Sequence, residues 1–172
     1  MTDSEPSPTA PEARLSHVGE GLQGREARMV DVGSKAATRR TARARARLRF
    51  PGGVLEEVLA GSGPKGPVQE VARVAGIQAC KRTSEWIPMC HPLALDHVAI
   101  EFERLGEDLL EVRCEASCTG RTGVEMEALT GASAAALTVY DMSKALAKGI
   151  RVEGLELVEK TGGASGPWRR ED

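Results

Sequence analysis

Residues 38–50 show a period of two, with apolar and polar side chains in strict alternation from Ala42 onward. The odd positions from 43 to 49 are all arginine, and the even positions from 42 to 50 are alanine, leucine or phenylalanine. Because successive side chains of a strand point to opposite faces, this pattern predicts a strand with one buried face. Pro51 and the two glycines after it end the strand.

Two helices are predicted next in the chain. Residues 54–60 have the composition of a short helix, and apolar positions repeat at helical spacing over residues 68–80. The glycine- and proline-rich residues 61–67 join them and carry one charged side chain, Lys65.

Residues 87–93 cannot be helical, because two prolines restrict the residues before them to extended conformations. Alternation over residues 98–103 and 110–118, on either side of a turn at Gly106, predicts an antiparallel hairpin.

The longest helix is predicted to begin at a Thr-x-x-Glu capping box formed by Thr122 and Glu125. It runs to about Lys148, is stopped by Gly149, and is followed by a strand over residues 150–158. The resulting order of elements is a split βαβ pattern. We therefore expect an α+β, ferredoxin-like fold in which helices pack on one face of an antiparallel sheet.

Composition sets the domain organisation and excludes several classes of protein. The 172 residues are 41% hydrophobic and 28% charged, which is typical of a soluble globular chain. We expect a flexible arm over residues 1–24, one catalytic domain over residues 25–160 and a flexible tail over residues 161–172. No apolar run approaches the length of a membrane-spanning helix, and no signal sequence begins the chain, so we expect a cytoplasmic protein with free cysteines.

The net charge of −2 disfavours a globally basic nucleic-acid binder, and aromatic residues, at 3%, are too few for base stacking. The arginines at positions 43–49 could still bind nucleic acid or a partner, or they could form the solvated face of a sheet. Four like charges on one face repel each other unless anions or acidic neighbours neutralise them. Candidate acidic neighbours lie on the predicted hairpin: Glu101, Glu103, Glu111 and Glu115.

The cysteines and one histidine each allow two interpretations. Cys114 and Cys118 have strand periodicity, which favours core thiols over a zinc site. Cys90 could be a nucleophile, but its neighbour His91 points to the opposite side of an extended chain. His91 itself lies between prolines that would fix its position, as a structural or a functional imidazole.

Acidic residues of the long helix are the remaining candidates. Asp141 and Lys144 share a face, as a helical salt bridge or a proton-transfer pair. Glu127 lies in the first turns, where no structural task explains it. Asp141 and Glu127 are 14 residues apart, or roughly 21 Å along the helix axis. If both serve one reaction, a second subunit must bring its own helix end to the site.

Four motifs together resemble the cyclic pyranopterin monophosphate synthase family of molybdenum cofactor biosynthesis. The resemblance covers residues 15 to about 167. The motifs are Met29-Val30-Asp31-Val32, residues 75–83 (AGIQACKRT), residues 88–93 (PMCHPL), and residues 119–130 (TGRTGVEMEALT) followed by residues 136–142 (ALTVYDM).

The resemblance implies a ferredoxin-like hexamer built from dimers, with active sites between subunits. Its substrate would be (8S)-3',8-cyclo-7,8-dihydroguanosine 5'-triphosphate, and its products cyclic pyranopterin monophosphate and diphosphate. No metal or organic cofactor would be required, although Mg2+ could accompany the triphosphate. The partners would be this nucleotide-derived substrate and other copies of the chain, not a membrane or a nucleic acid.

The resemblance also assigns site residues. Asp141, Lys144 and Lys65 match its catalytic positions. Its substrate-binding segments match Met89, Cys90, His91, Glu125, Met126 and Glu127. Further candidate phosphate contacts are Lys81 and Arg82, with Lys160 and the arginine strand as weaker ones. This chain departs from the family at Ala164, where a lysine is frequent.

Two other functions compete with the synthase. A non-catalytic oligomeric module could bind nucleotides or nucleic acid through residues 43–49, and its binding would weaken steeply with salt. A thiol or zinc protein is the third alternative.

Overall fold

The computed structural model describes residues 18–21, 24–61 and 65–171. The chain forms two compact units that divide after Val30. In the first unit, strands β1 (Val18–Gly21) and β2 (Gly24–Ala27) pair antiparallel. The sequence analysis missed this hairpin, because four-residue strands are too short to show periodicity. The expected flexible arm otherwise falls on residues 1–17 and 22–23, outside the described residues.

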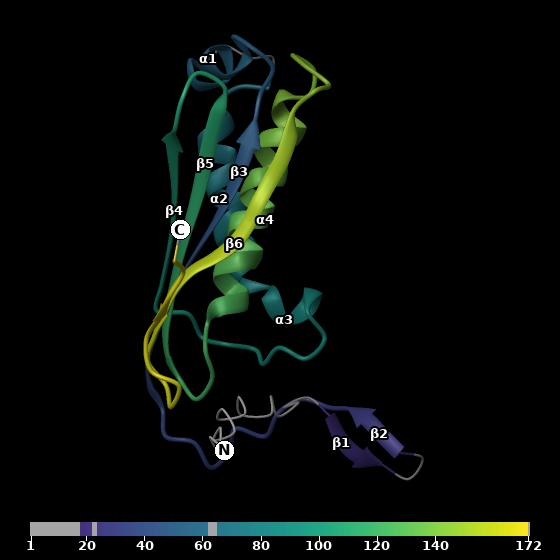
Figure 1. Cartoon of the computed structure of the whole chain (residues 1–172), viewed down its shortest axis with the longest axis vertical. Coiled ribbons are helices and arrows are strands. Elements are labelled where there is room, and N and C mark those ends of the chain that lie inside the picture. The colour runs from purple at the N-terminus through teal and green to yellow at the C-terminus, as the bar shows by residue number, and fades with distance from the viewer. Residues whose placement is uncertain (1–17, 22–23, 62–64, 172) are drawn as a thin grey trace, which may run out of the picture. The chain divides into compact units, whose positions relative to one another are not determined.

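The second unit is built on a five-stranded antiparallel sheet in the order β4-β5-β3-β6-β7 (Figure 1). The predicted arginine-rich strand lies at its centre. The order of the four long strands is that of the expected ferredoxin-like fold. The strands are β3 (Thr38–Arg49), β4 (His97–Arg104), β5 (Leu109–Gly120), β6 (Arg151–Thr161) and β7 (Trp168–Arg169).

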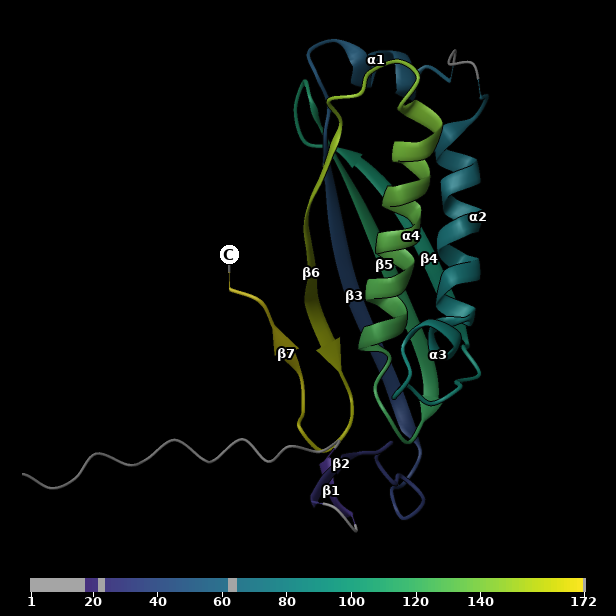
Figure 2. The ribbon, with the colours of Figure 1, turned by 90° about the vertical axis from the view of Figure 1, so that its right-hand side faces the viewer.

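Helices α2 and α4 lie side by side on one face of this sheet (Figure 2). The four helices are α1 (Val54–Leu59), α2 (Val68–Lys81), α3 (Thr83–Trp86) and α4 (Glu125–Ser143). The fold is therefore the α+β architecture that the sequence predicts. Within the described ranges, no helix has the length and hydropathy needed to cross a membrane.

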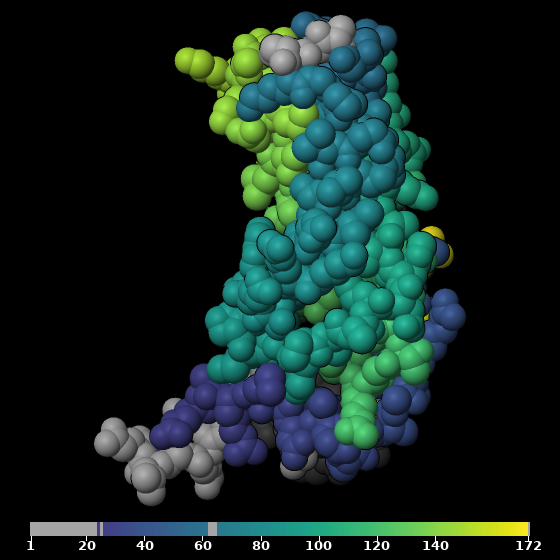
Figure 3. Space-filling view, turned by 180° about the vertical axis from the view of Figure 1, so that it is seen from behind, coloured from purple at the N-terminus to yellow at the C-terminus, as the bar shows by residue number. Residues whose placement is uncertain are grey.

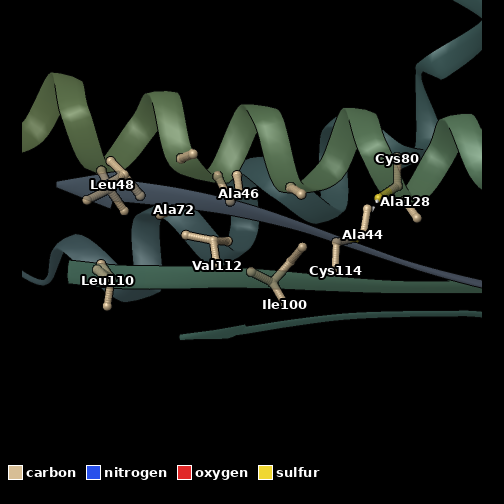
Figure 4. Close-up of a cluster of buried hydrophobic side chains, with 14 of the residues drawn as sticks. Ala44, Ala46, Leu48, Ala72, Cys80, Ile100, Leu110, Val112, Cys114 and Ala128 are labelled. Atoms are coloured by element: carbon tan, nitrogen blue, oxygen red, sulfur yellow. Dashed lines mark hydrogen bonds between the residues drawn. The ribbon is translucent and has the colours of Figure 1, made fainter. Parts of the chain in front are cut away.

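Small side chains allow α4 to lie close to the sheet. The even positions of β3 from Ala42 to Leu48 are buried, as predicted, and face the alanines of α4, with Ala44, Ala46 and Ala128 among them (Figure 4). Helices α2 and α4 also approach closely, because a Cβ on Gly76 would lie only 3.0 Å from the carbonyl oxygen of Gly131. This close backbone approach fixes how α2 and α4 pack against each other.

The arginines at the odd positions 43–49 of β3 point to the opposite, helix-free face, where each meets a carboxylate. Their closest ion-pair distances lie between 2.5 and 3.2 Å. The pairs are Arg43 with Glu115 and Glu159, Arg45 with Glu156, Arg47 with Glu111, and Arg49 with Asp108 and Glu153. The predicted cross-strand neutralisation is confirmed for Glu111 and Glu115. The carboxylates on β6 were not anticipated.

Two boundaries and one short helix differ from the prediction. The capping box is wrong, because Glu125 is the first residue of α4 and no side chain caps that helix. The helix ends at Ser143 and not near Lys148, because the amide of Leu146 donates to the carbonyl of Ser143 three residues back, a spacing tighter than that of an α-helix. Helix α3 was also missed, since it is only four residues long.

The C-terminal segment, expected to be a flexible tail over residues 161–172, contains a strand. Trp168 and Arg169 of β7 pair with Lys160 and Glu159 of β6. Glycines at positive φ between the two strands allow the chain to turn back: Gly162, Gly163 and Gly166. Only Asp172 lies outside the description here.

Candidate active site

The C-terminal end of α4 carries a carboxylate held between two lysines. The Nζ atom of Lys65 lies 2.9 Å from Oδ2 of Asp141 and donates to its backbone carbonyl at 3.0 Å. Lys144, one turn further along the helix, donates to Oδ1 of Asp141 at 2.6 Å. Lys65 comes from the glycine- and proline-rich loop between α1 and α2. The structure thus brings together all three residues predicted to be catalytic.

This environment controls the charge of Asp141. Hydrogen bonds from Lys144 and Lys65, supported by their positive charges, lower the pKa of Asp141 to about 2. The same contact raises the pKa of Lys144. The carboxylate is therefore ionised and a weak base while both lysines hold it. An anionic ligand that draws the lysines away would make it a stronger base.

The N-terminal end of α4 carries a carboxyl group whose pKa is shifted in the opposite direction. The residue Glu127 is only 3% exposed. Burial raises the pKa of Glu127 to about 7, its own backbone amide partly offsets that effect, and the charge of Glu125 adds to it. Near neutral pH a large fraction of Glu127 is protonated, so its side chain can donate as well as accept a proton.

Cys80 helps to hold this end of the helix. Its thiol donates to the backbone carbonyl of Glu127 at 3.1 Å, and its Sγ lies 3.6 Å from that of Cys114. The interaction ties the last turn of α2 to the first turn of α4. Sequence reasoning missed this role, because a cysteine at a buried helical position gives no signal beyond its hydrophobic periodicity.

The proline-braced segment lies at the same end of the molecule. Residues 87–93 are not helical, as predicted, and Met89, Cys90 and His91 are all half-buried. Burial, then the negative charge of Glu127, raises the pKa of the Cys90 thiol. A thiol with a raised pKa is a poor nucleophile, which argues against covalent catalysis by Cys90.

The other predicted substrate-binding residues also belong to the N-terminal end of α4. Glu125 and Met126 are half-buried in its first turn, and Lys81 and Arg82 are exposed at the end of α2. From behind, the surface of α2 continues into the segment after it (Figure 3). The predicted site residues therefore form two groups, one at each end of α4.

The interpretation of Cys114 and Cys118 as core thiols is confirmed, since both are about 1% exposed. All four cysteines are free. In the part of the chain that the structure describes, no three His, Cys, Asp or Glu side chains are grouped closely enough to hold a metal ion.

Comparison with known proteins gives consistent matches over most of the chain. Residues 29–163 match the MoaC family. The chain is 53% identical to the cyclic pyranopterin monophosphate synthase of Novosphingobium aromaticivorans, over 90% of this chain and 96% of that protein. Proteins with the same name from Chloroflexus aggregans and Thermomicrobium roseum are 51% and 50% identical, over 92% and 93% of this chain and 95% of each relative. These matches show that the chain belongs to the MoaC family.

Proposed function

We propose that this protein is a cyclic pyranopterin monophosphate synthase of molybdenum cofactor biosynthesis, a lyase. It converts (8S)-3',8-cyclo-7,8-dihydroguanosine 5'-triphosphate to cyclic pyranopterin monophosphate and releases diphosphate. The relatives' shared name supports this assignment. The structural observation that carries it is the cluster in which Lys65 and Lys144 hold Asp141.

The reaction rearranges rings and therefore moves several protons. Two carboxyl groups with very different pKa values suit such a sequence, because one accepts protons while the other can donate them. Asp141, ionised between lysines, is the acceptor once a bound anion weakens its ion pairs. Glu127, with its pKa near 7, serves as a donor.

Closure of the cyclic phosphate requires positive charge. A sugar hydroxyl attacks the inner phosphorus while diphosphate leaves, so negative charge spreads over the phosphate oxygens in the transition state. Lys65 and Lys144 can meet that charge at one end of the site, as can Lys81 and Arg82 at the other. The protein requires no resident cofactor, and any Mg2+ enters with the triphosphate.

The two groups on α4 belong to one active site only in an oligomer. Fourteen residues separate Asp141 from Glu127 on one straight helix, or roughly 21 Å. A small nucleotide cannot contact both groups of a single chain. The C-terminal end of one α4 therefore meets the N-terminal end of a partner's, in a homo-oligomer that we expect to be a hexamer built from dimers.

The alternative of nucleic-acid binding through the arginine strand has less support. Arg43, Arg45, Arg47 and Arg49 already meet carboxylates of β5, β6 and the β4–β5 turn. Nucleic acid would have to displace those carboxylates. Binding that weakens steeply with added salt would favour this alternative, whereas turnover of one small triphosphate falls far less.

The direct test incubates the purified protein with the cyclised nucleotide. We expect stoichiometric release of diphosphate, together with a product that becomes a fluorescent pterin after oxidation. Absence of both signals from a folded oligomer would refute the proposed function.

A further inference from the structure

Two buried cysteines meet where α2, β5 and α4 come together (Figure 4). Cys80, in the last turn of α2, is 2% exposed, and Cys114 of β5 is 1% exposed. Their Sγ atoms lie 3.6 Å apart, and the thiol of Cys80 donates to the backbone carbonyl of Glu127 at 3.1 Å. Because Cys80 uses its only proton for this carbonyl, Cys114 is the donor between the two sulfurs. The thiols therefore form a hydrogen-bonded chain that ends on the first turns of α4.

Both sulfurs interact with the backbone of α4. Cys80 contacts the carbonyl of Glu127, and the backbone of Ala132 hydrogen-bonds to the sulfur of Cys114. The hydrogen bond with Cys80, followed by burial, raises the pKa of the Cys114 thiol. Cys114 therefore remains a neutral thiol near neutral pH and keeps its proton for Cys80.

Gly131 makes room for the two thiols, one turn along α4 from Glu127. A Cβ atom at Gly131 would overlap both Sγ atoms. On α2, Gly76 lies one turn before Cys80, and a Cβ there would lie only 3.0 Å from the carbonyl oxygen of Gly131. The size of the side chains at this helix crossing therefore sets how deeply the start of α4 lies against α2.

The depth of this turn decides the environment of the Glu127 side chain, which is only 3% exposed. Ionisable side chains interact with it from α4, from β5 and from the segment before β4: Glu125, Cys118 and Cys90. Burial raises the pKa of both of these thiols, so they are neutral near neutral pH. Burial is also the largest influence on the pKa of Glu127, ahead of the charge of Glu125.

We propose that Cys80 and Cys114 are positioning residues for Glu127, because the thiol pair holds the start of α4 at the depth where the Glu127 carboxyl stays buried and can donate a proton. This inference rests on the proposed function for the part that Glu127 plays in the reaction. Both thiols are buried, so they act through the backbone of α4 and are not catalytic residues. Loss of the Cys80 thiol leaves a cavity and removes a donor from the carbonyl of Glu127, so that water reaches its carboxyl more easily.

The test follows the protonation of Glu127 directly, in the full-length oligomer. The band of its protonated carboxyl is titrated by infrared spectroscopy and is identified by its absence from Glu127→Gln. Cys80→Ala should lower the pKa of Glu127 from about 7 toward its ordinary value of 4.5. Cys80→Ser should keep the wild-type pKa, because a hydroxyl can donate to the same carbonyl.

The pH profile of turnover gives a second measurement. If Glu127 is the proton donor, activity above its pKa follows the protonated fraction, which falls tenfold for each pH unit. Cys80→Ala should therefore lower kcat by about three- to tenfold at pH 8 and by less than about twofold at pH 6. Cys80→Ser should restore the wild-type profile.

The matched control is Val112→Ala, which opens a cavity on the same buried face of β5 as Cys114. Val112 lies two residues earlier in β5, farther from the start of α4 (Figure 4). The control should lower stability and leave the pKa of Glu127 and the pH profile unchanged. If Cys80→Ala does not fold, Cys114→Ala decides the question, because it removes the sulfur that supports Cys80 and should lower the pKa of Glu127 by a smaller amount.

The outcomes separate this inference from the proposed function. An unchanged pKa of Glu127 in folded Cys80→Ala, the same fall in Cys80→Ser, or an equal fall in Val112→Ala would overturn the positioning role while wild-type turnover could still be observed. A fall confined to the Cys80→Ala and Cys114→Ala variants, in a protein that does not turn over the cyclised nucleotide, would keep the role of the thiol pair in burying Glu127 and refute the synthase.

Discussion

The two ends of α4 place the same functional group, a carboxyl, in opposite surroundings. At the C-terminal end, Asp141 is exposed, contacts two lysines and has a pKa of about 2. At the N-terminal end, Glu127 is buried, forms no ion pair with a described residue and has a pKa of about 7. Ion pairing stabilises the charged form of the first, and burial favours the neutral form of the second.

The comparison shows how one helix can supply an ionised carboxylate and a protonated one at the same pH. Neither state follows from residue type, since both groups would ionise near pH 4 in water. The lysines and the tight packing around the start of α4 determine the difference. The following variants test it, from the largest expected effect to the smallest.

Asp141→Asn should lower turnover by about 10²- to 10⁴-fold, the usual range for loss of a general acid or base. The amide keeps the shape of the side chain but cannot accept a proton. The measurement is kcat for diphosphate release. Glu70→Gln is the matched control, because it removes a carboxylate from another exposed i,i+3 ion pair, that with Arg73. Equal rates for Asp141→Asn and wild type would remove Asp141 from the mechanism.

Lys65→Ala should lower kcat/KM by about 10²-fold, comparable to the loss of one preorganised donor to a developing charge. It should also raise the pKa of Asp141 toward its ordinary value, because one of its two lysines is gone. Lys148→Ala, an exposed lysine beyond the end of α4, is the control. A variant that keeps its oligomeric state and wild-type kcat/KM would contradict this role.

Glu127→Gln should make the protein more stable at high pH. The folded state holds the proton of Glu127 up to about pH 7, against an ordinary pKa of 4.5. Its burial therefore costs stability increasingly as pH rises from 4.5 to 7, and the cost stays constant above that. Relative to wild type, the variant should gain roughly 1–3 kcal/mol of unfolding free energy at pH 8 and little at pH 4.5. Urea titrations at both pH values would show it, and a pH-independent difference would contradict the raised pKa.

Cys90→Ser should have the smallest effect. Burial and the charge of Glu127 raise the pKa of this thiol, so it is not poised as a thiolate. We expect turnover to fall less than about tenfold, whereas loss of a catalytic nucleophile costs orders of magnitude more. A loss as large as that of Asp141→Asn would restore the covalent mechanism.

Periodicity predicted β3, α2 and the β4–β5 hairpin because each has one buried face. The alternation in β3 and the helical spacing in α2 appear directly in the sequence, and so does the 14-residue separation of Asp141 and Glu127. Short elements such as α3 and β7 contain too few residues to show a period. The start of α4 was misplaced because a Thr-x-x-Glu pattern can occur without forming its hydrogen bonds.

Contacts between distant segments were harder to predict. The family resemblance indicated Lys65, but only the fold shows its Nζ against Asp141, 76 residues away in the sequence. The raised pKa of Glu127 depends on burial, which no local pattern reveals.

The central claim, that each active site combines the C-terminal end of one α4 with the N-terminal end of its partner's, can be tested by mixing inactive variants. Asp141→Asn and His91→Ala subunits are co-refolded in equal amounts, with Lys65→Ala and Asp141→Asn as the control pair. Half of the randomly formed dimers are mixed and each has one intact site of two, so the first pair should recover roughly a quarter of wild-type turnover. The control pair should recover none, because both substitutions break the same end of α4. Failure of the first pair to recover turnover, in oligomers shown to be mixed, would contradict the shared site.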